Sequence, residues 1–461
     1  MSGINAKKQN MDLIKGRERH ICRKNGTGDA NAIACDSESV AGAVSQRACV
    51  FCGARVVLNP IADALHLIHG PVGCSAYTWD IRGSLSSGPE LHRLSFSTDL
   101  QEQDVIFGGE KKLLDALDEL IDRHRPAGAF VYSTCISGVI GDDLKAVCAK
   151  VEREKGIPVI PVQSEGFKGN KNEGYKAACS ALFTLMKHGQ PRETVPLSVN
   201  ILGDFNLAGE LWIIREYLEE IGLTVIANIS GDARVADVAR APEAALNLVQ
   251  CSGSMAQLAR MMRLRNGIPF LRVSYIGIED TVESLLAAAA FFDDAQVGKA
   301  ARRLIDRETA ACSAELDRYR KELSGRKAAV YVGGAFKAVS LIKAFRSLDM
   351  RVMIVGSQTG RQEDYEKISE VADPGTVIID DANPLELAQL MNRLGIDIFV
   401  GGVKERPMAY KLGVAFCDHN HERKRPLEGF AGMLNFAREV HGSISSPVWR
   451  FVPRARIAGA E

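Results

Sequence analysis

The stretch "AGAFVYSTCISGVIGDD", residues 127–143, joins an apolar run to a polar, glycine-rich turn. The run 127–134 is typical of a strand buried on both faces, because its apolar residues are continuous rather than alternating. Strands of this kind belong to parallel sheets, in which a helix follows each strand. Ligands bind beyond the carboxyl ends of such strands, so the turn that contains Cys135 is a candidate binding position.

The same pattern recurs along the chain. Seven further runs have the composition of buried strands: 157–162, 198–203, 223–228, 328–334, 350–356, 375–380 and 396–402. Helical patterns such as 110–125 and 208–222 lie between these runs, and the second ends at Gly222, a typical residue for a helix C-terminus. This alternation predicts an α/β protein with mainly parallel sheets.

Two segments divide the chain. Residues 187–198 are polar and contain proline, and residues 297–327 form a charged helical pattern that leads into a new strand. We therefore expect a flexible polar tail followed by three Rossmann-like domains: the tail 1–46 and the domains 47–197, 198–325 and 326–461. Cys22 and Cys35 lie in the tail, and we expect both to be solvated.

The overall composition is that of a soluble globular protein. Lys and Arg together number 57, as do Asp and Glu, so no global charge favours nucleic acid or a membrane surface. No apolar run approaches the roughly 20 residues of a membrane span. The first residues lack the apolar core of a secretory signal. We expect a cytoplasmic protein that binds neither nucleic acid nor a membrane.

In that compartment the eleven cysteines are expected to remain reduced, so they do not predict a disulfide framework. Cys49 and Cys52 have the spacing of half a zinc ribbon, but no second Cys-x-x-Cys follows at the expected distance. A thioredoxin-like motif is also disfavoured, because we expect Cys52 to precede a strand rather than to open a helix.

Three cysteines lie at separate turns. Cys74 is in a turn bracketed by glycine and proline, Cys135 follows a strand, and Cys49 precedes both. Thiolates on separate turns favour an iron–sulfur cluster over zinc, which tends to take local pairs of ligands. A cubane needs a fourth ligand. It would come from Cys52, from a group other than cysteine, or from another chain.

Further turns follow the predicted strands, including "GDFNLAGE", "GGAFKAV" and "GGVKERP". None has the pattern G-x-G-x-x-G or G-x-x-x-x-G-K-[ST], so the common dinucleotide and P-loop sites have no support. Cys251 in "LNLVQCSGSM" follows an apolar run and precedes small residues, which would leave room for a bulky ligand. Taken alone, it is more typical of a buried cysteine than of a ligand.

Together these segments resemble the nitrogenase component 1 family over about residues 47 to 453. The resemblance is carried by Cys49, "HGPVGCSAYTWDIRG", "FSTDLQEQDVIFGGEKKL", "STCISGVIGDDL", "IPVQSEGFKG", "NLVQCSGSM" and "LEGFAGMLNFAREV". It implies the α-subunit type of fold, with three Rossmann-like domains. Within the family, "GCSAYTWDIRGSLSSGPELHRLSFSTDL" is closer to the biosynthetic paralogue than to the catalytic α subunit. A protochlorophyllide-reductase-like paralogue is disfavoured, since such an enzyme needs no thiolate at Cys251.

The resemblance also implies a ligand set. Cys49, Cys74 and Cys135 match cysteines that, with one cysteine of a partner chain, bind a [4Fe-4S] cluster at a subunit interface. Cys52 has no counterpart in the family. Cys251 matches the cysteine that holds one end of the iron–molybdenum cofactor in the catalytic subunit.

The molybdenum end of that cofactor is held by a histidine, whose position matches Asn420. Asparagine is a poor metal ligand compared with imidazole. His419 and His421 flank it, so an alignment shift of one residue would restore a histidine. Lys404 matches a lysine near the organic acid of the cofactor. Phe336 and Lys337 stand where the catalytic subunit has an arginine, so that contact is not expected here.

These matches imply a scaffold subunit that binds, matures and releases a precursor of the iron–molybdenum cofactor. The precursor would have an iron–sulfur core and gain molybdenum and homocitrate on maturation. The expected partners are a second biosynthetic chain in an α2β2 heterotetramer, the nitrogenase iron protein and a cluster-donating biosynthesis protein. Any activity would be of the oxidoreductase type. The alternative is a catalytic α subunit that reduces dinitrogen, and the sequence leaves the heterometal open.

Overall fold

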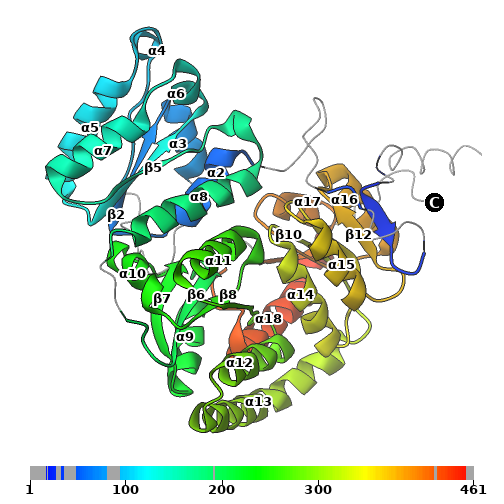
Figure 1. The fold of residues 1–461 in the computed structure, drawn as a ribbon. Coiled ribbons are helices and arrows are strands. Elements are labelled where there is room, and N and C mark those ends of the chain that lie inside the picture. Colours follow the sequence, from blue (N-terminus) through cyan, green and yellow to red (C-terminus); the bar gives the residue numbers. More distant parts are fainter. Residues whose placement is uncertain are drawn as a thin grey trace, which may run out of the picture. The chain divides into compact units, whose positions relative to one another are not determined.

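The computed structural model describes residues 17, 19–26, 33–35, 48–79, 94–189, 193–419 and 423–452. The chain forms two compact units. Unit 1 comprises Met1–Arg47, Ser274–Leu286 and Arg302–Glu461, and unit 2 comprises Ala48–Val273 and Ala287–Ala301. Figure 1 shows the elements of both units.

Unit 2 begins with a parallel sheet of four strands in the order β3-β2-β4-β5. The strands are β2 (Ala64–His69), β3 (Ser95–Ser97), β4 (Gly128–Ser133) and β5 (Val159–Val162). The helices are α2 (Val50–Leu58), α3 (Val72–Trp79), α4 (Glu102–Phe107), α5 (Glu110–His124), α6 (Cys135–Ile140), α7 (Leu144–Lys155) and α8 (Lys171–Met186), with a 3-10 turn, η3, at Gly166–Lys168.

Alternate residues of β2 face two different cores, as expected for a strand covered on both sides. Leu65 and Leu67 pack with residues of α5 and α7, whereas Ala64 and Ile68 pack with residues of α2 and α8. The sheet is thus buried between two layers of helices, with α5 and α7 on one face in Figure 1.

A second parallel sheet of unit 2 has the order β7-β6-β8-β9. Its strands are β6 (Ser198–Asp204), β7 (Thr224–Ser230), β8 (Leu246–Val249) and β9 (Phe270–Arg272). Its helices are α9 (Glu210–Glu220), α10 (Val235–Arg240) and α11 (Ser252–Asn266), with η4 at Ala241–Glu243. Ile68 of the first sheet and Leu202 of the second belong to one continuous core, which explains why both sheets lie in one unit.

Unit 1 contains a sheet of six strands in the order β1-β12-β11-β10-β13-β14. They are β1 (Ile21–Arg23), β10 (Lys327–Val332), β11 (Arg351–Ser357), β12 (Val377–Asp380), β13 (Ile398–Gly401) and β14 (Ala415–Asp418). Its helices are α14 (Ala335–Ser347), α15 (Gln362–Val371), α16 (Pro384–Leu394), α17 (Arg406–Lys411) and α18 (Gly429–Ile444), with η5 at Pro447–Arg450. Helices α12 (Ile278–Phe292) and α13 (Ala295–Leu323) have residues in both units.

The predicted α/β architecture is confirmed, and the eight predicted strand runs correspond to β4, β5, β6, β7, β10, β11, β12 and β13. Each predicted domain contains one of the three sheets, but the first two sheets share unit 2, so the division into three domains stays a prediction. No helix within the described ranges is long and apolar enough to cross a membrane.

The predicted flexible tail contains an ordered strand. β1 pairs antiparallel with β12, and Arg17 forms an ion pair of 2.9 Å with Glu386. Cys22 lies in β1 and is 2% exposed, so our expectation that it is solvated was wrong. The strand escaped prediction because it is three residues long and its partner lies more than 350 residues away.

Helices α2 and α8 approach each other closely through two glycines. A Cβ atom on Gly174 of α8 would lie 2.0 Å from the carbonyl oxygen of Val50, and one on Gly53 of α2 would lie 2.1 Å from the carbonyl oxygen of Lys171. Both neighbours are backbone atoms, which cannot yield as a flexible side chain can. The contact therefore requires glycine on each helix.

We predict that Gly174→Ala lowers the free energy of unfolding by about 1–3 kcal/mol or more, because the new methyl group forces the two backbones apart. Gly298→Ala on α13 is the matched control, since its Cβ would meet no atom within 4 Å. The control should be neutral or stabilising by up to about 1 kcal/mol. Chemical denaturation of both variants measures the difference, and equal stabilities would contradict the prediction.

Candidate metal centre

The three cysteines predicted as cluster ligands all lie in unit 2, at the starts of helices. Cys49 is the N-cap of α2, Cys74 is the third residue of α3, and Cys135 is the first residue of α6. Strands β2 and β4, which precede α3 and α6, are parallel neighbours. Their carboxyl ends therefore deliver Cys74 and Cys135 to the same edge of the sheet.

Gly166, in the turn after β5, lies beside the side chains of Cys49 and Cys135. A Cβ atom at this position would lie 3.0 Å from Sγ of Cys135 and 3.5 Å from Sγ of Cys49. The pKa of the Cys74 thiol is raised, first by burial and then by the nearby Cys135 and Cys49. The structure thus brings together the three cysteines that the sequence analysis singled out.

The chemistry of this group fits an iron–sulfur cluster. No three His, Cys, Asp or Glu side chains in the described part of the chain are arranged to hold a single metal ion. The cysteines of a cubane each bind a different iron, so they stand further apart than the ligands of one ion. Cys135 is exposed, and Cys49 and Cys74 are partly exposed, so these thiols are accessible from outside the chain.

Two local expectations were wrong. Cys74, expected in a turn, lies in helix α3, and Cys52, expected before a strand, lies in helix α2. The position of Cys52 therefore does not disfavour a thioredoxin-like motif, because Cys49 and Cys52 lie at the start of a helix. The side chain of Cys49 nevertheless lies beside Gly166 with that of Cys135, which favours a shared ligand set over an isolated Cys49–Cys52 pair.

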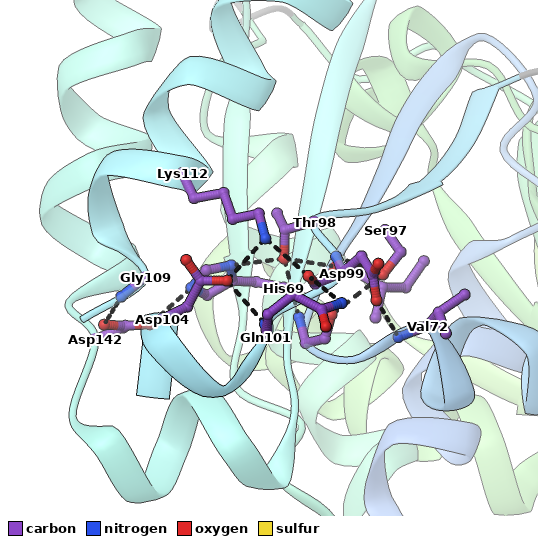
Figure 2. A network of polar contacts seen from close by, with 12 residues as sticks. His69, Val72, Ser97, Thr98, Asp99, Gln101, Asp104, Gly109, Lys112 and Asp142 are labelled. Carbon is purple, nitrogen blue, oxygen red and sulfur yellow. Dashed lines mark hydrogen bonds and ion pairs between the residues drawn. The ribbon is translucent and has the colours of Figure 1, made fainter. Parts of the chain in front are cut away.

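A polar network between the end of β2, α4 and the segment after α6 was not predicted from the sequence (Figure 2). His69, the last residue of β2, is fully buried, and its Nε2 lies 2.8 Å from Oδ2 of Asp142, which follows α6. Oδ1 of Asp142 accepts a hydrogen bond of 2.9 Å from the backbone N–H of Gly109. The network joins the segment that leads to Cys74 with the segment that leaves Cys135.

Burial lowers the pKa of His69, although Asp142 opposes this effect. A neutral imidazole donates from one nitrogen and accepts at the other. Nε2 therefore donates to Asp142, and Nδ1 accepts from the hydroxyl of Thr98 at 3.1 Å. The hydroxyl of Thr134, the N-cap of α6, donates to the carbonyl oxygen of His69 at 3.0 Å. Strand β2 is thus hydrogen-bonded to the start of the helix that carries Cys135.

Cys251 lies in the same unit, at the N-cap of α11, directly after β8. Gly203 of β6 has a φ of +99°, and a Cβ atom there would lie 2.6 Å from Cβ of Cys251. The thiol of Cys179 on α8 donates to the carbonyl oxygen of Ser254 at 3.1 Å. Cys251 also acts electrostatically on Tyr175 of α8, whose pKa is raised, mainly by burial. Helix α8 therefore contacts the segment that carries Cys251.

The remaining candidate residues belong to unit 1. Lys404 is exposed in the turn after β13, and the backbone N–H of Gly402 in this turn donates to the carboxylate of Glu405 at 2.9 Å. Asn420 and His421 lie outside the described residues. His419 is fully buried, neither ring nitrogen has a hydrogen-bond partner within the described chain, and burial lowers its pKa well below the usual value.

Comparison with known proteins gives one consistent family. The model of nitrogenase component 1 type oxidoreductases matches residues 49–445. The chain is 55% identical to the nitrogenase iron-molybdenum cofactor biosynthesis protein NifE of Clostridium pasteurianum, over 96% of this chain and 98% of that protein. It is 52% identical to the protein of the same name from Methanosarcina barkeri, over 97% of this chain and 98% of that protein.

A solved structure of nitrogenase Cp1 at pH 5 has the same fold. Its TM-score is 0.87 at 32% sequence identity, and the match covers 96% of this chain and 97% of that chain. The confirmed fold class includes the nitrogenase component 1 type of arrangement that the sequence analysis expected.

We predict that Gly166→Ala reduces the iron and sulfide content of the anaerobically purified protein by more than half, because its methyl group would occupy the space between Cys49 and Cys135. Gly73→Ala is the control: it adjoins Cys74, but its Cβ would meet no atom within 4 Å. Iron and sulfide analysis of both variants measures the effect. Full iron content in Gly166→Ala would contradict the prediction that a methyl group at this position excludes a cluster.

Proposed function

Because this chain belongs to the nitrogenase component 1 type oxidoreductase family, we propose that it is a scaffold subunit on which a precursor of the nitrogenase iron–molybdenum cofactor is bound, matured and released to the catalytic protein. The observation that carries this proposal is the 55% identity, over 96% of the chain, to a protein named for cofactor biosynthesis. The identity to nitrogenase Cp1 is 32%, which favours the scaffold over the catalytic alternative.

In this proposal Cys49, Cys74 and Cys135 hold three corners of a [4Fe-4S] cluster. One cysteine of a NifN-like subunit holds the fourth, in an α2β2 heterotetramer. The approach of Cys49 and Cys135 at Gly166, and the effect of both on the pKa of Cys74, support this arrangement. A cluster shared by two chains stabilises their association, since ligand binding and assembly become linked. When bound, the cluster supplies one-electron redox chemistry.

The precursor is the substrate of the scaffold, received from a cluster-donating biosynthesis protein. Cys251 supplies a soft thiolate for an iron corner of its iron–sulfur core. Asn420 offers a weak ligand where the catalytic subunit has imidazole, and Lys404 offers a positive charge to the carboxylates of homocitrate. One strong bond and several weak contacts retain the precursor during maturation and permit its release afterwards.

The nitrogenase iron protein is the proposed electron donor, and it docks beside the interface cluster. Three consecutive residues of α4, Val105, Ile106 and Phe107, are 44%, 74% and 86% exposed, and Val139 of α6 is 75% exposed. We call these four residues the apolar ridge. Helix α6, which begins at Cys135, contacts α4. Grouped exposed apolar side chains mark an interaction surface, and this one adjoins the cysteines that electrons must reach.

Cys251→Ala tests the precursor site directly. We expect the variant to lose the precursor and to retain the interface cluster, because Cys251 caps α11 and follows a strand of a different sheet from the one that leads to Cys74 and Cys135. Iron analysis with electron paramagnetic resonance distinguishes the two clusters. Cys312→Ala is the control, a buried thiol on α13 outside unit 2. Full precursor loading of Cys251→Ala would contradict the proposed site.

Asn420→His separates the scaffold from the catalyst. An imidazole at this position would add a strong ligand at the molybdenum end, so we expect transfer of the matured cluster to the catalytic protein to slow by about tenfold or more, which corresponds to about 1.4 kcal/mol. Transfer is followed as the rate at which cofactor-free catalytic protein gains its cofactor spectrum. A rate equal to that of the parent would contradict the assignment of Asn420.

A further inference from the structure

Lys112 of α5 lies between the apolar ridge and the segment that leads to Cys74. Its ammonium nitrogen donates to Oδ2 of Asp104 on α4 at 2.7 Å and to the carbonyl oxygen of Asp99 at 2.8 Å (Figure 2). Asp104 immediately precedes Val105 of the ridge. The same carboxylate oxygen caps α4 by accepting the backbone N–H of Gln101 at 2.8 Å. Lys112 therefore fixes the start of the ridge helix to the backbone of Asp99.

Asp99 continues the connection to the cluster site. Its Oδ1 accepts the backbone N–H of Val72, the first residue of α3, at 3.2 Å. Cys74 is two residues further along the same helix. Asp99 has a φ of +49°, and the hydroxyl of Ser97 accepts its backbone N–H at 3.0 Å. A residue in this left-handed conformation is held by its contacts, so loss of the Lys112 bond at its carbonyl oxygen changes the position of its side chain.

A second branch of the network reaches Cys135. The backbone N–H of Gly109, just after the ridge helix, donates to Asp142, and Asp142 accepts from buried His69. The Lys112 branch begins at the N-terminal end of α4 and reaches α3, which carries Cys74. The Gly109 branch begins after the C-terminal end of α4 and reaches the end of α6, which carries Cys135. Displacement of α4 is thus transmitted to the cluster site through hydrogen bonds rather than through apolar contacts, which adapt more easily.

Docking on the ridge would change the strength of the Lys112 branch. The side chain of Lys112 is 36% exposed and that of Asp104 is 19% exposed, so water now screens their ion pair. The ionised form of Asp104 is favoured over the protonated form, because the backbone N–H of Gln101 and the Lys112 ammonium lower its pKa. A partner that covers the ridge excludes water from this pair, and the attraction between the charges then increases.

We propose that Lys112 is a positioning residue that couples docking of the electron donor on the apolar ridge to the geometry of α3, and so to the environment of the cluster at Cys74. The proposal rests on the proposed function, because it requires the interface cluster and a donor that docks on α4. It adds a role for residues that bind neither the cluster nor the precursor.

The test compares Lys112→Met with Lys111→Met in the complete heterotetramer. Lys111 is the adjacent residue of α5, and its side chain is 87% exposed and pairs with Asp115. The measurement is the reduction potential and the electron paramagnetic resonance spectrum of the interface cluster, with and without the iron protein and a non-hydrolysable ATP analogue. In the parent and in Lys111→Met, we expect the iron protein to shift both signals.

In Lys112→Met we expect the cluster content to be retained, the affinity for the iron protein to change by less than about fivefold, and the docking-induced shift to fall by more than half. Lys112→Arg should restore most of the shift, since it keeps the charge. Asp104→Asn is a second variant that keeps the cap of α4 but removes the ion pair, and it should lose the shift as well.

A docking-induced shift in Lys112→Met and Asp104→Asn equal to that of the parent would overturn the coupling alone. Loss of the cluster from both variants would also overturn it, because Lys112 would then act on folding rather than on coupling. Absence of an interface cluster from the parent would overturn the proposed function together with the coupling.

Discussion

Strands β2 and β4 run side by side and end together, with His69 directly opposite Ser133 in the register. Gly70 follows β2 and Thr134 follows β4. A Cβ atom on Gly70 would lie 2.3 Å from the hydroxyl oxygen of Thr134. This close approach of two chain segments sets the distance between the helices that follow. The distance between Cys74 and Cys135 depends on this approach, because each lies within the first turn of its helix.

The runs of apolar residues predicted eight strands well, but β2 and β8, which also contain buried polar residues, escaped detection. β2 contains His66, whose Nδ1 lies 2.9 Å from the hydroxyl of Tyr132, and β8 contains Asn247, whose Oδ1 accepts from Asn200 at 2.8 Å. Each polar group is buried and bonded to a residue of a neighbouring strand that is distant in sequence. Local hydrophobicity underestimates such strands, since the partner that makes burial tolerable is known only from the fold.

The candidate site likewise contains residues that the sequence predicted and residues that it did not. The three cysteines could be named from the sequence, because they lie in separate segments and the resemblance assigns them a shared role. The residues that orient the cysteines could not be named, since Lys112, Asp104 and Asp142 are ordinary charged residues in helical or turn contexts. Only the parallel arrangement of β2, β3 and β4 brings their segments together. The supporting network is therefore a property of the topology, not of a motif.

Helix α8 gives unit 2 a second connection, between Cys49 and Cys251. At Gly174 it touches the backbone of α2, the helix capped by Cys49, and five residues later Cys179 bonds to the first turn of α11, the helix capped by Cys251. One regular helix thus fixes both caps, and the contact with α2 is between backbone atoms. Rotamer changes do not relax a backbone contact, so the spacing of the two thiols is set by helix geometry. The proposed function makes this constant spacing useful, because a scaffold that exchanged its precursor at Cys251 would do so without altering a cluster at Cys49.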